Sequence, residues 1–247
     1  MRVVDLDRDM SDVIPTGASA DSVHLFERMT ERTLRAASAV PGARVLDAAG
    51  GLGQDSRELA GRGVRVVCVE PSRRMSALGR QLGESGPAGV SWARAWCEAL
   101  PFRDDSFDAS ICKGALDHFD DPLACIAEMA RVTRPGGRVV FAVANFESLA
   151  CRLGRRFGAA GSGRAGHHVP SDHFTRYDPE LLREQLSRHL RLRHWEGVSL
   201  LWGVRGWARL LEKLGPRQRR AWLRTADAAA RRVPALADVI VAAGTPR

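Results

Sequence analysis

Short apolar runs alternate along the chain with segments whose apolar residues recur at helical spacing. The apolar runs predict strands at 45–46, 64–69, 90–93, 107–112, 138–143, 190–195 and 237–242. The helical spacing predicts helices at 21–39, 56–60, 71–82, 122–132 and 180–189, with a further helical stretch within 203–232. Because strands that alternate with helices form a parallel sheet covered on both faces, we expect an α/β protein with a doubly wound, mostly parallel seven-stranded sheet.

A glycine cluster follows the first expected strand. That strand ends in Asp47, and Gly50, Gly51 and Gly53 then lead into a helix. A turn without side chains lets a ligand approach the backbone, and the amides at a helix start favour a carboxylate or a phosphate. The second strand ends at Glu70, at about the 20-residue spacing typical of an acid that binds a ribose. A glycine turn with such an acid suits nicotinamide dinucleotides and S-adenosylmethionine alike.

Length, composition and cysteine content describe an ordinary globular domain. The chain has 247 residues, of which 45% are hydrophobic and 27% charged. The N-terminus lacks an apolar core and no apolar run approaches the ~20 residues that span a bilayer, so we expect neither a secretory signal nor a membrane span. The five cysteines show no C-x-x-C spacing, which predicts a reduced, cytoplasmic protein without disulfides or a zinc site.

The charge is strongly basic, with a net value of +8 and a pI of about 10.2. Such an excess of positive charge is typical of proteins that bind nucleic acid. Only Lys113 and Lys213 are lysines, however, and the arginines are spread through the helices except for a concentration over 217–232. This distribution makes a nucleic-acid partner the less expected one, and we expect a monomer or a homodimer.

Three further motifs follow the glycine turn V-L-D-A-A-G-G-L-G at 45–53 in a fixed order. They are V-C-V-E-P-S at 67–72, E-A-L-P-F with D-S-F-D within 98–108, and R-V-T-R-P-G-G-R at 131–138. Together the four resemble the motifs of the class I S-adenosylmethionine-dependent methyltransferases, in particular the group that acts on small molecules. The last three motifs are not expected in nicotinamide-dependent enzymes. The resemblance implies a Rossmann-like fold and S-adenosyl-L-methionine as the cofactor.

The resemblance covers residues 43–145 closely and 172–187 more loosely, and it implies an organisation within one domain. The expected parts are an N-terminal arm and lid helix at 1–42, a cofactor-binding core at 43–145, a lid insertion on the acceptor side at 146–189, and the last strands with a helical insertion at 190–247.

Carried over residue by residue, the family pattern implies a set of cofactor contacts. Gly51 and Gly53 would pack against the methionyl part of the cofactor beside Asp47. Glu70 would hold the ribose, and Lys113 would lie beside the sulfonium, followed by Gly114. The adenine would be bordered by Pro71, Ser72 and Met75 on one side and by the backbone of Cys97 and Glu98 on the other.

Two positions depart from the family pattern. Ala49 stands where the first glycine is usual, and its small methyl group should be tolerated. Trp96 stands where many relatives carry an acid that contacts the adenine amine. Either Trp96 stacks near the base, or Glu98 or the backbone meets the amine.

Two histidines are candidate catalytic bases. His118 follows the fourth expected strand, at the edge where open α/β sheets bind ligands, and it matches a histidine that many relatives carry. His173 lies in the polar segment 167–177, which resembles a family segment that closes over the acceptor. Either histidine could deprotonate a phenol or an enol. Equally, Asp117 or His118 could cap the next helix or order the loop, and residues 175–179 could be the cap and entry of the helix after them.

Two other features of the chain have a functional and a plain interpretation. Segment 167–177 holds three histidines and an aspartate as well as Arg176 and Tyr177, which could contact an acceptor, but no metal-binding helix pattern accompanies them and we expect no metal. The stretch from Trp202 to Trp222 interleaves apolar and basic residues. It could touch lipid or an acidic surface, although such a stripe more often packs on the core or on a second subunit.

Three functions remain open from the sequence. The first is methylation of a metabolite or natural product, as in secondary metabolism, with oxygen as the expected acceptor atom and carbon or nitrogen as alternatives. The second is an RNA or DNA methyltransferase, although no N/D-P-P-Y/F sequence follows the fourth strand. The third is a module that binds the cofactor without catalysis.

Overall fold

Seven strands form one sheet in the computed structural model, which describes residues 19–83, 89–157 and 175–247. They are β1 (Arg44–Ala48), β2 (Arg65–Val69), β3 (Val90–Ala93), β4 (Phe107–Lys113), β5 (Thr133–Ala144), β6 (Leu190–Val198) and β7 (Val239–Pro246). Their order is β3-β2-β1-β4-β5-β7-β6. Every pair from β3 to β5 is parallel, whereas β7 runs antiparallel to both β5 and β6. The predicted doubly wound, mostly parallel seven-stranded sheet is confirmed.

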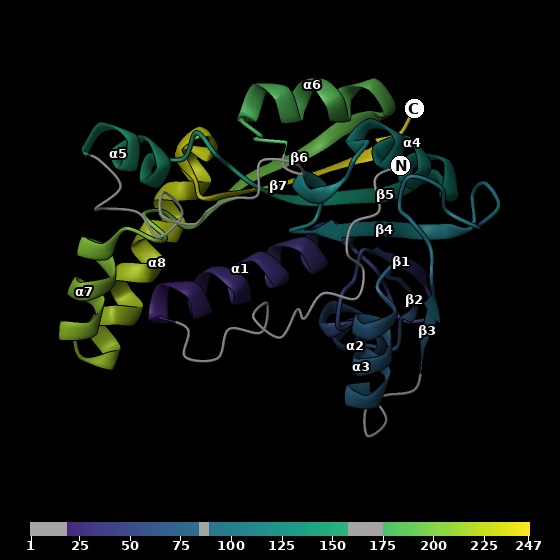
Figure 1. The fold of residues 1–247 in the computed structure, drawn as a ribbon, viewed down its shortest axis with the longest axis horizontal. Coiled ribbons are helices and arrows are strands. Elements are labelled where there is room, and N and C mark those ends of the chain that lie inside the picture. The colour runs from purple at the N-terminus through teal and green to yellow at the C-terminus, as the bar shows by residue number, and fades with distance from the viewer. Residues whose placement is uncertain (1–18, 84–88, 158–174) are drawn as a thin grey trace.

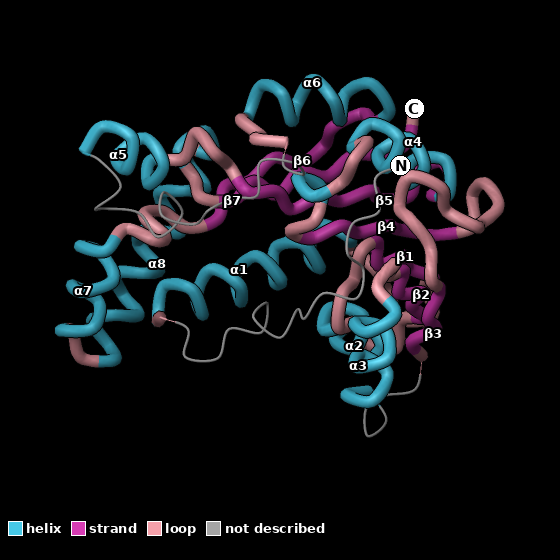
Figure 2. Tube along the Cα trace, in the orientation of Figure 1, coloured by secondary structure: helices cyan, strands magenta, loops and turns pink. Residues whose placement is uncertain are grey.

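Helices cover both faces of this sheet (Figure 1), and Figure 2 shows them on either side of the strands. They are α1 (Ala20–Ala37), α2 (Gln54–Gly61), α3 (Arg73–Gly83), α4 (Pro122–Val132), α5 (Leu149–Phe157), α6 (Pro179–His189), α7 (Arg205–Lys213) and α8 (Pro216–Arg232), with short helical turns η2 (Leu116–His118) and η3 (Pro234–Leu236). Helix α1 packs across β4, β5 and β7, and α4 and α6 pack together on the opposite face.

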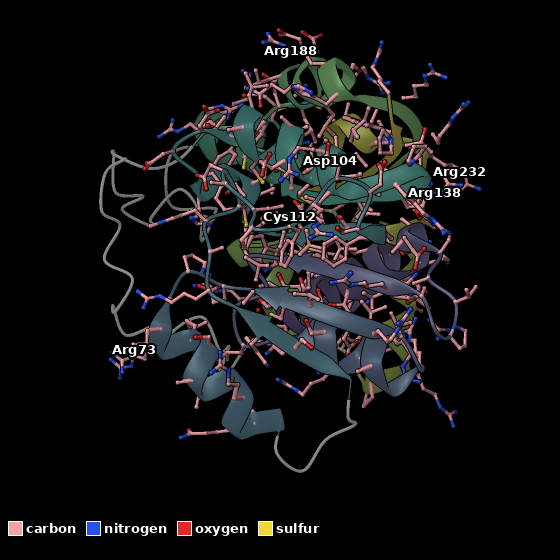
Figure 3. All side chains as sticks on the ribbon, turned by 90° about the vertical axis from the view of Figure 1, so that its right-hand side faces the viewer. Arg73, Asp104, Cys112, Arg138, Arg188 and Arg232 are labelled. Carbon is pink, nitrogen blue, oxygen red and sulfur yellow. The ribbon has the colours of Figure 1, made fainter. Side chains whose placement is uncertain are left out.

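The central strand β5 joins the two halves of the core. Its side chains alternate, as they must in a strand. Phe141 and its neighbours two positions away face a cluster with α4 and α6, and Val140 and Ala142 face a cluster with α1 and α2. Both faces of β5 are therefore buried, which is typical of a sheet covered by helices. In Figure 3, Cys112 on the neighbouring strand β4 lies inside, whereas Arg188 and Arg232 reach away from the ribbon.

Several predicted boundaries agree with the structure. Helix α4 covers 122–132 as predicted, with a proline in its first turn and Asp121 as its cap. Asp178 caps α6 by accepting hydrogen bonds from the amides of Glu180 and Leu181, which confirms the cap expected within 175–179.

Other boundaries differ from the prediction for local reasons. Helix α1 begins one residue earlier than expected, so Ser19 occupies the cap position and Asp21 lies buried in the first turn. Residues 134–137, between the expected helix 122–132 and the expected strand 138–143, belong to β5, and its pairing with β4 passes over them through a shift in register. The stretch 203–232 is two helices, because Gly215 and Pro216 interrupt it. Helix α5 was not predicted, and residues 1–18 of the expected arm lie outside the described residues.

Candidate cofactor site and active site

The carboxyl ends of β1, β2 and β4 meet where the strand order reverses. Chain order runs outward from β1 to β2 and β3 on one side, and β4 and β5 lie on the other side. Open α/β sheets bind ligands in the crevice at this kind of switch point. The glycine turn follows β1, Glu70 follows β2, and Lys113 ends β4. The fold thus brings together residues that the sequence placed at three separate positions.

The glycine turn has two glycines that pack against protein and one that faces open space. A Cβ on Gly50 would lie 2.5 Å from the sulfur of Cys68, and one on Gly53 would lie 2.8 Å from the Trp92 ring. A Cβ on Gly51 would meet only Met75 Cε, at 3.6 Å. Gly51 is therefore the residue of this turn that leaves room for a ligand to approach the backbone.

Ala49 shows why a glycine is usual at its position. Its φ is +54°, in the left-handed region that an L-residue with a Cβ disfavours. The methyl group is tolerated, as expected, but the backbone there is strained. Gly51 and Gly53 also have positive φ, +57° and +70°, so the turn contains three left-handed residues.

Glu70 is bound by backbone amides from both sides of the crevice. One carboxylate oxygen accepts from the amide of Gly51 at 3.0 Å, and the other accepts from the amide of Ser72 at 2.9 Å. Burial raises the pKa of Glu70, while these two amides favour its charged form. The hydroxyl of Ser72 in turn accepts from the amide of Met75 at 3.1 Å. The predicted ribose acid thus lies next to the open position at Gly51.

Asp47 lies beneath the turn and is buried. Its carboxylate accepts a hydrogen bond from the hydroxyl of Ser56 at 2.6 Å. Burial raises the pKa of Asp47 to about 7, and the nearby Asp55 carboxylate raises it further, against the effect of the Ser56 hydrogen bond and Lys113. A cationic ligand group beside it would favour the ionised form.

Lys113 connects three elements at this edge. Its ammonium donates to Asp55 Oδ1 and to Thr30 Oγ1, both at 2.6 Å. The side chain therefore links β4 to α2 and to α1. The sequence did not identify Asp55, Ser56 or Thr30, and the one available signal was the pair of polar residues in the first turn of α2. A position of Lys113 beside the sulfonium stays a prediction.

The predicted adenine side holds one buried acceptor without a partner. Met75 and Cys97 are buried, and Trp96 is half-buried. Glu98 Oε2 is buried and has no hydrogen-bond partner among the described residues. Such an atom costs free energy unless a ligand donates to it, and the amine of adenine is a suitable donor. Together with the open cradle at Gly51, this atom fits an adenosyl group, so Glu98 is the better of the alternatives left open at Trp96.

His118 lies in η2, directly after β4, with half of its side chain exposed. Burial lowers its pKa below the ordinary value of 6.5, although Asp117 acts in the opposite direction. The imidazole is therefore neutral at pH 7 and able to accept a proton. Asp121, and neither Asp117 nor His118, caps the following helix, so the capping role is wrong, whereas a role in ordering the loop stays a prediction.

The second group of predicted acceptor residues is only partly described. His173, with His167 and His168, lies outside the described residues. Tyr177 is buried, and its hydroxyl donates to Gln185 at 2.7 Å. Burial raises the pKa of this phenol, so it serves as a core hydrogen-bond donor.

Neither a metal site nor a membrane-spanning helix is found among the described residues. Within 19–83, 89–157 and 175–247, no three His, Cys, Asp or Glu side chains are grouped as metal ligands. Over the same part of the chain, none of the helices combines the length and the apolar content needed to cross a membrane.

Comparisons with known proteins agree with this geometry. Residues 46–141 match the family model described as a methyltransferase domain. The demethylmenaquinone methyltransferase of Renibacterium salmoninarum is 39% identical over 107 residues, which cover 43% of this chain and 44% of the relative. The ubiquinone/menaquinone biosynthesis C-methyltransferase of Geobacter sulfurreducens is 38% identical over 120 residues, 47% of this chain and 46% of the relative. The aligned part thus spans about half the length of these curated relatives.

A solved structure extends the likeness of fold to nearly the whole chain. The S-adenosylmethionine-dependent methyltransferase of Mesorhizobium loti superposes with a TM-score of 0.64 at 18% identity, covering 90% of this chain and all of that one. The strand order, the four motifs and the matched domain lead to one assignment. Residues 46–141 match a methyltransferase domain, and the chain as a whole has the fold of a class I S-adenosylmethionine-dependent methyltransferase.

Proposed function

We propose that this protein transfers the methyl group of S-adenosylmethionine to a small-molecule acceptor. The observation that carries the proposal is the crevice at the switch point, where the open cradle at Gly51 adjoins a carboxylate, Glu70, held by two amides. The cofactor would supply an electrophilic methyl group on a sulfonium. The chain's part is then to align the acceptor with that methyl group and to exclude water.

His118 is the proposed base toward the acceptor. It lies at the carboxyl end of β4, next to the same crevice, and its lowered pKa keeps it neutral at pH 7. A neutral imidazole takes the proton of a phenol or an enol, which turns a weak nucleophile into a strong one. An acceptor that arrives protonated at oxygen is therefore the best match to this site. His173 stays a second predicted base.

The atom that receives the methyl group has two candidates. A phenolate can be methylated on its oxygen, and this is the reaction we predict from the sequence. A phenolate or enolate can also react at carbon, and carbon is favoured by the relative from Geobacter sulfurreducens, whose name specifies a C-methyltransferase in quinone biosynthesis. Deprotonation by His118 serves either reaction.

A transfer assay tests the proposal. The protein is incubated with methyl-labelled S-adenosylmethionine and, in parallel, a catechol, a simple phenol and reduced demethylmenaquinone. We expect S-adenosylhomocysteine and a methylated product with at least one phenolic acceptor, and mass spectrometry with NMR identifies the atom. His118→Gln should abolish most of the transfer, while His189→Gln, a histidine on α6, should not. Cofactor binding without transfer to any of these acceptors would contradict the proposal and favour a non-catalytic module.

A further inference from the structure

Nearly all of the net charge of the chain lies in one hairpin of helices. The segment 205–232, which is α7, α8 and the turn between them, contains nine basic residues and two acidic ones. Its net charge is therefore +7, against +8 for the whole chain. The remaining 219 residues are close to neutral, so the basic character of this protein is a property of one local structure.

In the part of the chain that the structure describes, the outer arginines of α8 have no acidic partners. Arg217, Arg220, Arg224 and Arg231 follow one another at helical spacing along one exposed face of α8. Among the described residues, no carboxylate lies within the 4.0 Å of an ion pair from any of them. Asp227, the one acid of α8, is directed inward and pairs with Arg28 and Arg32 of α1.

Several arginines outside the hairpin are neutralised by acidic side chains. Arg131 contacts Glu128 and Asp104, and Arg134 contacts Asp108. The α8 face differs from these sites because four exposed arginines follow one another there with no acidic side chain on the same face.

Exposed apolar side chains lie at the same end of the molecule. The described residues include seven large hydrophobic side chains that are exposed, and five of them belong to α7, α8, the end of α8 and the N-terminal half of α1: Val23, Phe26, Leu210, Trp222 and Val233. Trp222 is 51% exposed, and its ring meets the buried Trp207 ring edge-on at 6.3 Å. Figure 1 shows α7 and α8 beside the start of α1, at the end of the molecule opposite β3 and α3.

We infer that the α7–α8 hairpin is a docking surface for an anionic lipid bilayer. Arginines attract the phosphate groups of acidic lipids, and each basic residue near such a surface adds to the attraction. Leu210 on α7 supplies an apolar contact of the kind that enters the headgroup region. The chain would lie on the bilayer without crossing it. This inference goes beyond the proposed methyl transfer and does not depend on it.

Nucleic acid is the other polyanion that such a charge could meet. Binding to the phosphate backbone of a duplex is driven by basic residues and gains nothing from exposed aliphatic side chains. Exposed aliphatic side chains on and beside the same hairpin, Leu210 and Val233, therefore favour lipid. The same argument makes Leu210 the residue whose change distinguishes the two partners.

Sedimentation with vesicles tests the inference on the full chain. Vesicles of phosphatidylglycerol and phosphatidylcholine are compared with vesicles of phosphatidylcholine alone. We expect binding to the acidic vesicles only, and weaker binding as salt is added. The triple change Arg217→Gln, Arg220→Gln and Arg224→Gln should weaken binding about 100-fold. These side chains are exposed, so circular dichroism and S-adenosylmethionine binding should stay unchanged.

A matched control removes the same charge elsewhere. Arg80, Arg191 and Arg193 are exposed and belong to α3 and β6. Their change to Gln should weaken vesicle binding less than about threefold, because they lie outside the hairpin. Leu210→Ser should weaken vesicle binding about tenfold and leave binding to duplex DNA unchanged.

Three results would overturn the inference. The first is no binding of the wild-type protein to acidic vesicles at low salt. The second is an equal loss of binding in the two triple variants, which would mean that total charge alone matters. The third is binding to duplex DNA or RNA that is tighter than binding to vesicles, together with vesicle binding that Leu210→Ser leaves intact. That last result would identify a nucleic acid surface.

Discussion

Charged side chains have opposite environments at the two ends of this molecule. At the cofactor end, Asp47, Glu70 and Lys113 are buried or partly buried, and each is bound by hydrogen-bonding groups. At the other end, Arg217, Arg220, Arg224 and Arg231 of α8 are exposed and have no acidic partner in the described part of the chain. Buried charges that are held in place can bind one small ligand in one orientation. Exposed charges of one sign attract a large surface of opposite charge, with little demand on geometry.

A glycine at the cofactor end and a glycine in α7 also differ, in the space available for a side chain. Gly50 has no room for a side chain, because the turn packs on Cys68 and Asp47. Gly206 in α7 would meet no atom within 4 Å. The residue type is therefore fixed by packing at the cofactor end and is free at the helical end. Substitutions at matched positions can test this contrast.

The largest expected effect is on catalysis at the cofactor end. His118→Ala should lower kcat about 100-fold to 10,000-fold, the range typical of the loss of a general base. Because burial lowers the pKa of His118, the acidic limb of the wild-type kcat/KM profile, where the rate rises as His118 loses its proton, should have its midpoint below pH 6.5. Steady-state kinetics between pH 5 and 9 measure both, on acceptors found in the transfer assay. An unchanged rate in the variant would show that His118 is not the base.

Gly50→Ala should destabilise the fold by about 2–3 kcal/mol, since the added methyl group overlaps Cys68 and Asp47 in a filled core. Urea unfolding followed by circular dichroism measures the loss. Gly206→Ala is the control at the helical end and should raise the free energy of unfolding by about 0.5 kcal/mol, because alanine favours a helix. Equal effects of the two changes would remove the contrast between the ends.

Cofactor affinity should depend on the protonation of Asp47. Its pKa is raised to about 7 in the free protein, and a cationic cofactor favours the carboxylate. As the pH falls below 7, a proton must leave before the cofactor binds, so affinity should fall about tenfold per pH unit. Asp47→Asn should bind more weakly at pH 8 but show no such dependence. Calorimetry at several pH values tests this, and a wild-type affinity that is flat from pH 5 to 8 would contradict it.

The smallest expected effect is a gain in stability. Ala49 is held at a φ of +54°, which glycine adopts without strain. Ala49→Gly should raise the free energy of unfolding by about 0.5–1 kcal/mol, after the entropy cost of glycine is subtracted. A decrease in the unfolding midpoint would mean that the methyl group makes contacts that outweigh the strain.

The sequence predicted the parts of this fold that depend on local patterns. The apolar runs of β2 and β5 and the capped helix α4 are encoded by neighbouring residues, and so is the glycine turn next to Glu70. Interruptions depend on fewer residues and were partly missed: Gly215 and Pro216 divide a stretch that reads as continuous in its apolar spacing. Residues 134–137 lie within β5 but are paired with no residue of β4, because the pairing passes from Thr133, opposite Phe107, to Arg138, opposite Ala109, through a shift in register.

Contacts between residues that are far apart in the chain could not be predicted from the sequence. Thr30, Asp55 and Lys113 come from three separate elements, and no spacing rule connects them. The partnerless Glu98 atom and the strain at Ala49 likewise require coordinates. The family resemblance located the cofactor residues, while the means by which they are held came from the fold.

The most direct test of the central claim is a calorimetric titration of the protein with S-adenosylmethionine. Glu70→Ala is compared with the wild type and with Glu58→Ala, which changes an exposed glutamate of α2 that pairs with Arg62. We expect the wild type and Glu58→Ala to bind alike. Glu70→Ala should bind at least about 100-fold more weakly, because the two hydrogen bonds that the ribose hydroxyls would donate to the charged carboxylate are lost. Binding that is unchanged in Glu70→Ala, or absent in the wild type, would contradict the claim.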